Sequence, residues 1–299
     1  MTAAPHERLD RAMVSLAGLS VGDAFGEQFF AHPVTTERRV PARPWGYTDD
    51  TQMALSMVAV LRRHGRIDQD ALADDFAAHY EPGRGYGPAM HRVLRRIANG
   101  EHWSVVAGSS FEGQGSYGNG AAMRAAPLGA FFADDLGRVV EEAGSSARVT
   151  HAHPEGIAGA IAVAVAAAMA CRARHGDAPA PMQAAYLDAV LVHVPFSEVY
   201  SRLRRARDLS EGLPVETAAE ILGNGSLVSA QDTVPFALWC AARHLEDYEA
   251  SLWTTVTGLG DRDTTCAIAG GVVACFTGLE GIPTAWHSAR EPLPSLDAW

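Results

Sequence analysis

Apolar residues recur along the chain at the three-to-four-residue spacing of amphipathic helices, and the alternation typical of strands is nearly absent. Residues 51–64 are an example, because Met53, Met57 and Leu61 fall on one face and a glycine follows the last turn. Residues 187–194 are the one run that fits a helix or a strand equally. The pattern predicts helices over residues 9–22, 51–64, 68–80, 88–98, 121–132, 136–147, 154–174, 182–193, 197–208, 215–222, 233–246, 248–257 and 264–277.

Glycine clusters separate several of these helices, at residues 82–87, 113–120 and 258–260. Glycine permits positive φ and lets the main chain approach a ligand closely. No tandem repeat or internal linker divides the sequence, and residues 291–299 are expected to be loosely ordered. We therefore predict an all-α fold, a single domain spanning residues 1–299, with functional loops gathered at one end.

The composition is that of a globular protein with an acidic surface. The chain has 299 residues, is 47% hydrophobic and 20% charged, and carries a formal charge of −11. Such a surface disfavours a nucleic-acid partner without excluding one, and it disfavours an anionic membrane. An anionic small ligand would need local cations, a metal or backbone N–H groups. The first ten residues lack the apolar stretch of a secretory signal, so we expect a cytoplasmic protein.

An apolar segment and four cysteines indicate a buried core. Residues 156–171 consist mainly of glycine, alanine, isoleucine and valine, but the run is shorter than the ~20 residues that a bilayer crossing needs. We therefore predict a central buried helix and no membrane partner. Cys171, Cys240, Cys266 and Cys275 lie in apolar surroundings with no C-x-x-C pair. We expect reduced core thiols in place of a disulfide framework or a zinc site.

Two short acidic clusters lie near opposite ends of the chain. Residues 48–51 read Thr-Asp-Asp-Thr and residues 261–264 read Asp-Arg-Asp-Thr, and each stands directly before an apolar helix. Such residues can simply cap a helix and complement its dipole. Capping needs only one acceptor, however, and further carboxylates repel one another unless a cation neutralises them. Together the clusters supply hard oxygen ligands, which suit Mg²⁺ or Mn²⁺ better than zinc. If the fold brings them together, they form a site for one or two divalent metals.

The segment 115–120 is a second candidate site. It reads Gly-Ser-Tyr-Gly-Asn-Gly and leads into a predicted helix. Successive backbone N–H groups and a helix N-terminus favour anions, so the segment could hold a phosphate or ribose, or could be an ordinary flexible turn. It matches neither a Walker A loop nor a Rossmann fingerprint.

Other polar residues carry weaker signals. His151 and His153 are two residues apart and do not share a helix face, so each is most simply a structural histidine. Asp23 and Glu27 flank a glycine-marked region that is expected to end the first helix. Each could be a structural or surface acid, or could face a cleft.

The order of the motifs resembles that of the ADP-ribosylglycohydrolase family, the dinitrogenase-reductase-activating type of ADP-ribosyl hydrolase. The motifs are Gly-Asp-Ala-x-Gly from residue 22, Thr-Asp-Asp-Thr from 48, Arg-Gly-Tyr-Gly from 84, Gly-Asn-Gly-x-Ala-Met-Arg-x-x-Pro from 118, Thr-His from 150 and Gly-Asp-x-Asp-Thr from 260. The resemblance extends from about residue 18 to 277. It implies an orthogonal bundle of about 12–15 helices, a core over about residues 8–278, and a loop-lined cleft for two Mg²⁺ ions, or Mn²⁺.

The resemblance also implies roles for individual residues. The implied metal ligands are Thr48, Asp49, Asp50, Asp261, Asp263 and Thr264, with Asp263 bridging the ions. The implied ADP-ribose contacts are Gly85, Gly87, Ser116, Tyr117, Gly118, Asn119 and His151. The residues expected to act in catalysis are Asp49, Asp50 and Glu27.

The sequence departs from the family pattern at two positions. Phe30 stands where some members have a glutamate that acts in catalysis or on a metal, and Glu27 is the nearby acid. This departure favours an arginine-type linkage over serine-directed chemistry. Arg262 lies between the late aspartates, where it could reach a phosphate or point outward.

The expected function is Mg²⁺-dependent hydrolysis that releases ADP-ribose from an acceptor, above all a protein side chain, by a monomeric enzyme. One alternative is a hydrolase of a free ADP-ribosyl metabolite or of ADP-ribosylated nucleic acid. Another is a relative that binds ADP-ribose, or serves a structural role, without catalysis. Fold alone does not distinguish these alternatives.

Overall fold

The computed structural model describes residues 4–35, 37–176, 182–210, 212–296 and 299. Within them the chain forms fifteen α-helices, two short 3-10 helices and no β-sheet, with two isolated β-bridges. The predicted all-α fold is confirmed. The helices are α1 (Pro5–Ala31), α2 (Asp49–His64), α3 (Gln69–Ala78), α4 (Pro88–Ala98), α5 (Trp103–Gly108), η1 (Asn119–Ala121), α6 (Ala126–Phe131), α7 (Leu136–Arg148), α8 (Pro154–Arg174), α9 (Gln183–Leu191), α10 (Glu198–Asp208), α11 (Val215–Leu222), α12 (Ala230–Arg243), α13 (Tyr248–Thr257), α14 (Arg262–Thr277), η2 (Leu279–Gly281) and α15 (Thr284–Ala289).

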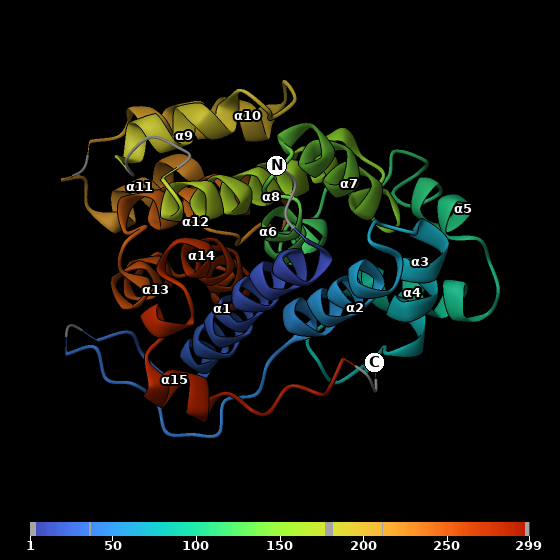
Figure 1. Cartoon of the computed structure of the whole chain (residues 1–299), viewed down its shortest axis with the longest axis horizontal. Coiled ribbons are helices and arrows are strands. Elements are labelled where there is room, and N and C mark those ends of the chain that lie inside the picture. The colour runs from blue at the N-terminus through green and yellow to red at the C-terminus, as the bar shows by residue number, and fades with distance from the viewer. Residues whose placement is uncertain (1–3, 36, 177–181, 211, 297–298) are drawn as a thin grey trace.

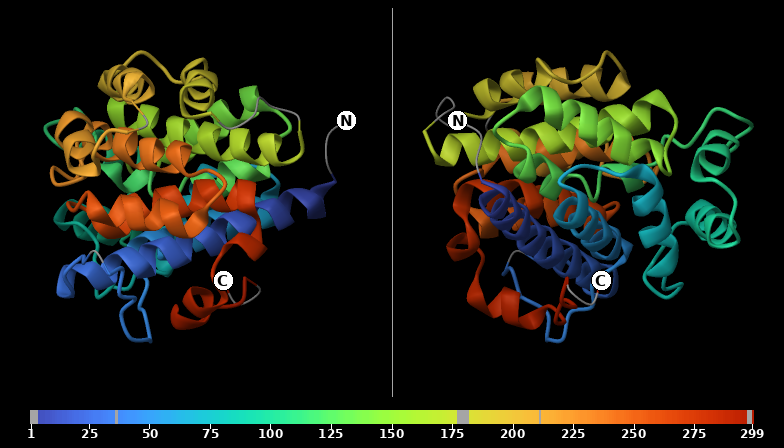
Figure 2. Two further views of the ribbon diagram at one scale, coloured as in Figure 1. Left: turned by 90° about the vertical axis from the view of Figure 1, so that its left-hand side faces the viewer. Right: turned by 45° about the vertical axis from the view of Figure 1, so that its right-hand side comes forward.

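The helices pack in layers around α1 and α14, which lie side by side in the middle of the bundle (Figure 1). Helix α2 lies beside α1, and α8 and α12 form the next layer. Helices α9 and α10 cover the outer edge, and α3, α4 and α5 gather at one end of the molecule (Figures 1 and 2). The first helix and the last long helix are thus neighbours, and Ser15 Oγ donates to the carbonyl oxygen of Gly271, 256 positions away in the sequence.

A row of glycines explains how closely α1 and α14 approach. A Cβ added at Gly18, Gly22 or Gly26 would lie under 3.0 Å from a backbone carbonyl oxygen of α14, at Gly270, Cys266 and Arg262 respectively. The contacted residue numbers fall along α14 as the glycine numbers rise along α1, so the two helices are antiparallel. The four-residue spacing places all three glycines on one face of α1. The close packing brings the carboxyl-terminal half of α1 to the amino-terminal end of α14, where the second acidic cluster begins.

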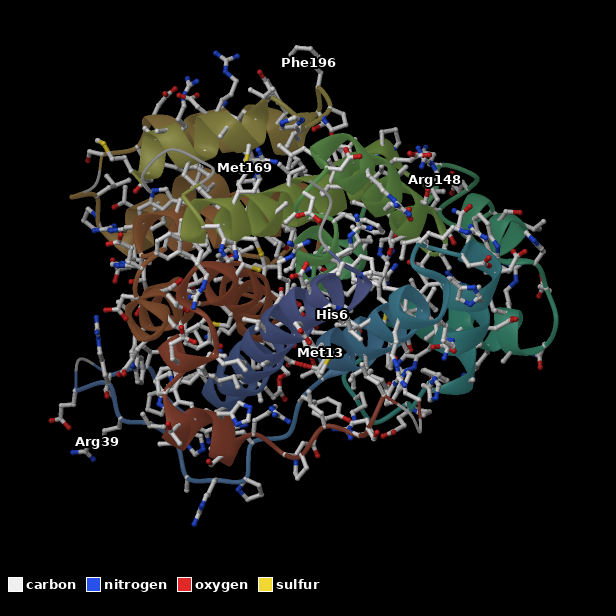
Figure 3. The ribbon with its side chains drawn as sticks, viewed as in Figure 1. His6, Met13, Arg39, Arg148, Met169 and Phe196 are labelled. Carbon is white, nitrogen blue, oxygen red and sulfur yellow. The ribbon has the colours of Figure 1, made fainter. Side chains whose placement is uncertain are left out.

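Helix α8 is the buried helix predicted from residues 156–171. It is long and apolar enough to span a membrane, but 78% of its apolar window is buried inside the bundle. Its Gly159 allows α12 to approach closely, because a Cβ at that position would lie 2.8 Å from the Cβ of Ala230. The four cysteines are buried and free, as predicted. Charged side chains such as Arg39 and Arg148 project from the surface, as does Phe196 on the connection between α9 and α10 (Figure 3).

Several expected boundaries were wrong. The first helix does not end at Gly22 but continues to Ala31, because its glycines serve packing and not termination. The short helices α5 and α15 were not predicted, and the helix expected at 121–132 is a 3-10 turn followed by the six-residue α6. The ambiguous run at 187–194 lies mainly in α9.

The carboxyl-terminal segment is also held more firmly than expected. Glu291 N donates to the carbonyl oxygen of Trp45, 2.9 Å away. The indole of Trp299 stacks on His79, with ring centroids 4.1 Å apart, and its Nε1 donates to Ser56 Oγ. Both ends of this segment therefore pack against the bundle.

Candidate active site

The two acidic clusters meet at one place in the fold. Thr264 Oγ1, in the first turn of α14, donates to Asp50 Oδ2 in the first turn of α2 at 3.5 Å. These residues are 214 positions apart in the sequence. The result is a carboxylate cluster, which we define as Asp23, Asp49, Asp50, Asp261 and Asp263.

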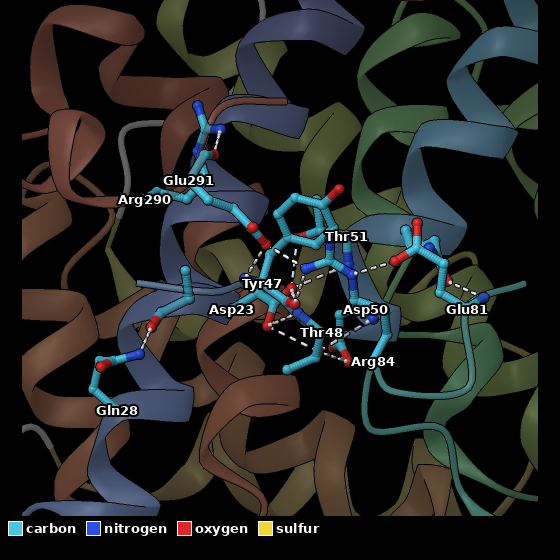
Figure 4. A network of polar contacts seen from close by, with 12 residues as sticks. Asp23, Gln28, Tyr47, Thr48, Asp50, Thr51, Glu81, Arg84, Arg290 and Glu291 are labelled. Carbon is cyan, nitrogen blue, oxygen red and sulfur yellow. Dashed lines mark hydrogen bonds and ion pairs between the residues drawn. The ribbon is translucent and has the colours of Figure 1, made fainter. Parts of the chain in front are cut away.

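Asp23 of α1 lies beneath the start of α2 and fixes it (Figure 4). Its carboxylate is fully buried and accepts hydrogen bonds from Thr48 N at 3.0 Å, Thr48 Oγ1 at 2.9 Å and Thr51 N at 3.1 Å. Thr51 Oγ1 also donates to it. Thr48 Oγ1 in turn accepts from Asp50 N, so Thr48 is the N-cap of α2, as the simple capping interpretation holds. Capping accounts for Thr48, and it leaves Asp49 and Asp50 without a capping role.

Two buried carboxylate oxygens in the cluster lack a hydrogen-bond partner within the described residues, Asp50 Oδ1 and Asp263 Oδ1. Leaving a charged oxygen unsatisfied in the interior is costly. The same two side chains come from opposite ends of the chain, and the charge of Asp263 helps to raise the pKa of Asp50. Buried carboxylate oxygens that no hydrogen-bond donor satisfies fit the chemistry of a divalent cation.

The acidic surroundings raise the pKa values of these carboxyl groups. Burial, then the neighbouring Asp23, raises the pKa of Asp49 to about 8. Burial and the charges of Asp23 and Asp261 hold the pKa values of Asp50 and Asp263 well above their ordinary range. Cations are needed if all of these groups are to be ionised at neutral pH.

No three His, Cys, Asp or Glu side chains of the described chain already converge at metal-binding distance. The donor types and the unpaired oxygens fit Mg²⁺, and full coordination would need the carboxylates to draw together around it.

A cavity of about 430 Å³ opens beside the cluster, and we call it the ligand cavity. It gathers all of the predicted site residues except Thr48 and Glu27. Those that line it are Asp49, Asp50, Gly85, Gly87, Ser116, Tyr117, Gly118, Asn119, His151, Asp261, Asp263 and Thr264. Sequence reasoning missed the apolar part of the wall, which includes Phe111, Leu227 and Val228. These three are exposed apolar side chains on loops, where no periodic pattern distinguishes them.

The 115–120 segment forms one wall of this cavity. Asn119 joins it to the cluster, because its Nδ2 donates to Asp261 Oδ2 at 2.7 Å and to Thr233 Oγ1 at 3.0 Å. A Cβ at Gly118 or Gly120 would lie 3.2 or 3.0 Å from the ring of His151, so small residues let the segment pack on that imidazole. The segment is therefore fixed against its neighbours and is not a free turn.

His151 is buried behind the segment, and its environment keeps it neutral. Burial and the nearby Arg124 lower the pKa of His151 to about 3. Its Nδ1 lies 2.7 Å from Thr150 Oγ1. Arg124, also fully buried, donates to that same hydroxyl at 2.9 Å and to the carbonyl oxygen of Gly120 at 3.1 Å. A neutral imidazole can present its other ring nitrogen toward a polar ligand in the cavity.

The Arg-Gly-Tyr-Gly loop closes the other side of the cluster. Asp49 N donates to the carbonyl oxygen of Arg84 at 2.7 Å, and Tyr86 Oη donates to Gln52 Oε1 at 2.7 Å. Gly85, with φ +90°, follows directly and lines the ligand cavity near Asp49. The loop and the start of α2 are thus one unit.

Thr48 and Glu27 line a second cavity of about 520 Å³, on the other side of Gly85. Gly85 lines both cavities. Glu27 is on α1, one turn beyond Asp23, and is half-buried. It is therefore close to the cluster but lies outside the ligand cavity.

The two departures from the family pattern lie together. The guanidinium of Arg262 stacks over the ring of Phe30, 5.1 Å from its centroid, and Nη1 donates to the carbonyl oxygen of Phe29 at 2.9 Å. Arg262 is thus held against the end of α1 and does not line the ligand cavity.

Asp23 is the residue that sequence reasoning undervalued. It is an acid in a helix whose glycines recur every four residues, at Gly18, Gly22 and Gly26. That spacing signals a buried face, and an acid beside it needs partners or a function. The signal was readable in the sequence.

Comparison with known proteins agrees with this geometry. The model of the ADP-ribosylglycohydrolase family matches residues 4–298. ADP-ribosylhydrolase ARH3 of Homo sapiens is 29% identical over 339 residues, covering 97% of this chain and 91% of that protein. ADP-ribosylarginine hydrolase Tri1 of Pseudomonas putida (strain GB-1) is 26% identical and covers 95% of this chain and 75% of that protein. A solved structure described as an ADP-ribosylglycohydrolase-related protein complex superposes with a TM-score of 0.64 at 27% identity, covering 96% of this chain and 94% of that one.

Proposed function

The chain belongs to the ADP-ribosylglycohydrolase family, and we propose that it uses Mg²⁺ to hydrolyse the bond between ADP-ribose and a modified protein side chain. The family and its ARH3 relatives make it a hydrolase. The cytoplasm as its location and the monomer as its working form are part of the same proposal.

The observation that carries the metal dependence is the pair of unpaired buried oxygens, Asp50 Oδ1 and Asp263 Oδ1, beside a 430 Å³ cavity. The residues that would hold two Mg²⁺ ions are Thr48, Asp49, Asp50, Asp261, Asp263 and Thr264. When bound, such ions neutralise the carboxylates and lower the pKa of a coordinated water. Mn²⁺, which prefers similar oxygen ligands, is the second candidate.

The ligand cavity supports ADP-ribose as the bound group. Backbone N–H groups of residues 115–120 suit the diphosphate, and Asn119 and the neutral His151 suit ribose hydroxyls. Tyr117 and Phe111, whose ring centroids are 6.1 Å apart, offer aromatic faces at the rim. The overall charge of the chain is negative and does not attract an anionic ligand, so these local groups would provide its recognition.

In the reaction, Asp49 or Asp50 would orient a water molecule and accept its proton. The bond between the anomeric carbon of the ribose and the acceptor breaks, the water oxygen bonds to that carbon, and a proton passes to the acceptor atom. Positive charge develops on the sugar as the acceptor leaves, and the carboxylate cluster stabilises it.

An arginine-type linkage is favoured over a serine-type linkage. The position at which some family members have a glutamate is Phe30 in this chain, stacked under Arg262. One relative, Tri1, is an ADP-ribosylarginine hydrolase by name. Both observations support an acceptor with a guanidinium group.

The test is release of ADP-ribose from an ADP-ribosylated protein, with Mg²⁺ or with a chelator. Asp50→Asn and Asp263→Asn remove a charge without changing shape, and we expect each to lower kcat at least 100-fold. Asp10→Asn, on the exposed face of α1, is the matched control and should keep full activity. Unchanged turnover in both site variants, or full activity in the chelator, would refute the proposal. A wild-type protein that binds ADP-ribose without turnover would point to a non-catalytic relative.

A further inference from the structure

The second cavity meets the ligand cavity at Gly85, and Thr48 in its lining donates to Asp23 and Asp50 of the carboxylate cluster. Thr48 lines the second cavity and the next residue, Asp49, lines the ligand cavity. Gly85 separates the two, and a Cβ at this position would lie 3.7 Å from both Asp49 Oδ1 and Thr48 Cβ. A substrate cleaved at the cluster has ADP-ribose on one side of the broken bond and the acceptor on the other. The ligand cavity would hold the ADP-ribose, and the adjoining second cavity is the space for the acceptor.

Most charges around the second cavity are already paired. Arg84 forms an ion pair with Glu81 at 3.2 Å, a second with Glu291, and donates to the carbonyl oxygen of Tyr47 at 3.0 Å (Figure 4). Its guanidinium also lies 4.0 Å from the centroid of the Tyr47 ring. Arg84 thus occupies one wall, where its own partners hold it.

Glu27 is the exception among the charged groups of that lining. Its carboxylate makes no hydrogen bond or ion pair in the described part of the chain, although it is half-buried. Burial and the negative charges of Asp23 and Asp261 raise its pKa, and among the described residues no cation offsets them. A half-buried carboxylate facing open space gains from a cationic partner brought by a ligand.

We infer that the second cavity is the acceptor subsite and that Glu27 is the residue that selects a guanidinium-bearing acceptor. The inference rests on the proposed hydrolysis of ADP-ribosyl linkages, and it adds the residue that recognises the acceptor side chain. A guanidinium can donate two parallel hydrogen bonds to one carboxylate and stack on an aromatic face. Arg84 of the same wall already stacks on Tyr47, so a ligand guanidinium would depend on Glu27 for its pairing.

A neutral acceptor would gain nothing from Glu27. A serine-linked substrate presents an ether-like oxygen and a peptide backbone, which would leave the carboxylate desolvated without a counter-ion. On α1 the acid stands at position 27 and an aromatic residue at position 30, with Arg262 covering the latter. Glu27 lines the second cavity, whereas Phe30 does not.

The experiment compares Glu27→Gln with the wild type on two substrates, ADP-ribosylarginine and a peptide carrying ADP-ribosylserine, with saturating Mg²⁺. We expect wild-type kcat/KM to be higher for the arginine linkage. Glu27→Gln should lower that value about tenfold, mainly through KM, and should lower kcat/KM for the serine linkage by a smaller factor, about threefold at most. Glu220→Gln, an exposed acid on α11, controls for loss of one negative charge and should change neither.

A second arm measures binding without turnover. Agmatine, a free guanidinium compound, is titrated into the Mg²⁺-loaded protein saturated with ADP-ribose, and we expect Glu27→Gln to weaken its binding about tenfold. Equal losses on both substrates would make Glu27 a general catalytic or metal-binding residue and would overturn the inference. So would a wild-type preference for the serine linkage, or agmatine binding that is unchanged in Glu27→Gln. If neither substrate is hydrolysed, the proposed function fails, and the agmatine arm still decides whether the cavity recognises a guanidinium.

Discussion

Replacement of Gly22 by alanine is the sharpest test of how the site is assembled. The added Cβ would lie 2.2 Å from the carbonyl oxygen of Cys266, where ordinary contacts begin near 3.4 Å. Helices α1 and α14 must therefore separate locally by about 1 Å, because a backbone carbonyl cannot rotate away as a flexible side chain can. Overpacking of this kind costs about 1–3 kcal/mol, and the better helix propensity of alanine returns about 0.5–1 kcal/mol.

The net expectation is a loss of about 1 kcal/mol in the free energy of unfolding, measured by urea denaturation. For a chain of this size that corresponds to a melting temperature lower by about 2 °C. The separation also moves Asp23 away from Asp263, so kcat should fall even where the variant is folded. Gly108→Ala is the matched control: it is also a helical glycine, but nothing lies within 4 Å of its added Cβ. Gly108→Ala should be neutral or slightly stabilising. Equal stabilities of the two variants would refute the packing argument.

Two further predictions concern the metal-free protein and the rim of the ligand cavity. Because burial raises the pKa of Asp49 to about 8, the stability that its protonated form contributes is complete below its unfolded pKa near 4 and is lost as the pH rises through 8. In a chelator, the difference in melting temperature between the wild type and Asp49→Asn should therefore shift against the wild type from pH 5 to pH 8. Mg²⁺ should stabilise the wild type more at pH 8 than at pH 5. A difference in melting temperature that does not depend on pH would contradict the raised pKa. Tyr117→Ala should weaken ADP-ribose binding about tenfold in calorimetry, because a stacked aromatic ring contributes about 1–3 kcal/mol. Phe196→Ala, which removes a 92% exposed ring remote from the cavity, should leave binding unchanged, and equal effects of the two would argue against stacking at Tyr117.

The meeting of the two acidic clusters could be anticipated from the sequence, because both stand at helix starts and carry more carboxylates than capping uses. The structure brings Asp50 within hydrogen-bond reach of Thr264, as that reasoning requires. The helical period also sufficed to predict the fold class and the buried α8.

Other features depended on tertiary packing and were not predicted. Glycines usually mark helix ends, so Gly22 was taken as an end, although here it lets α14 pack closely on a helix that continues to Ala31. Because the helix continues past Gly22, Asp23 is buried within it and accepts a hydrogen bond from Thr48 N. Glu27, one turn further on, lines the second cavity. The short helices α5 and α15 have six residues each, too few for a periodic signal.

The most direct test of the central claim is a crystal structure of the protein with Mn²⁺ and ADP-ribose, in which anomalous scattering locates the metal. We predict Mn²⁺ within bonding distance of Asp50 Oδ1 and Asp263 Oδ1, beside the ribose in the ligand cavity. ADP-ribose bound in that cavity with no metal between Asp50 and Asp263 would contradict the claim.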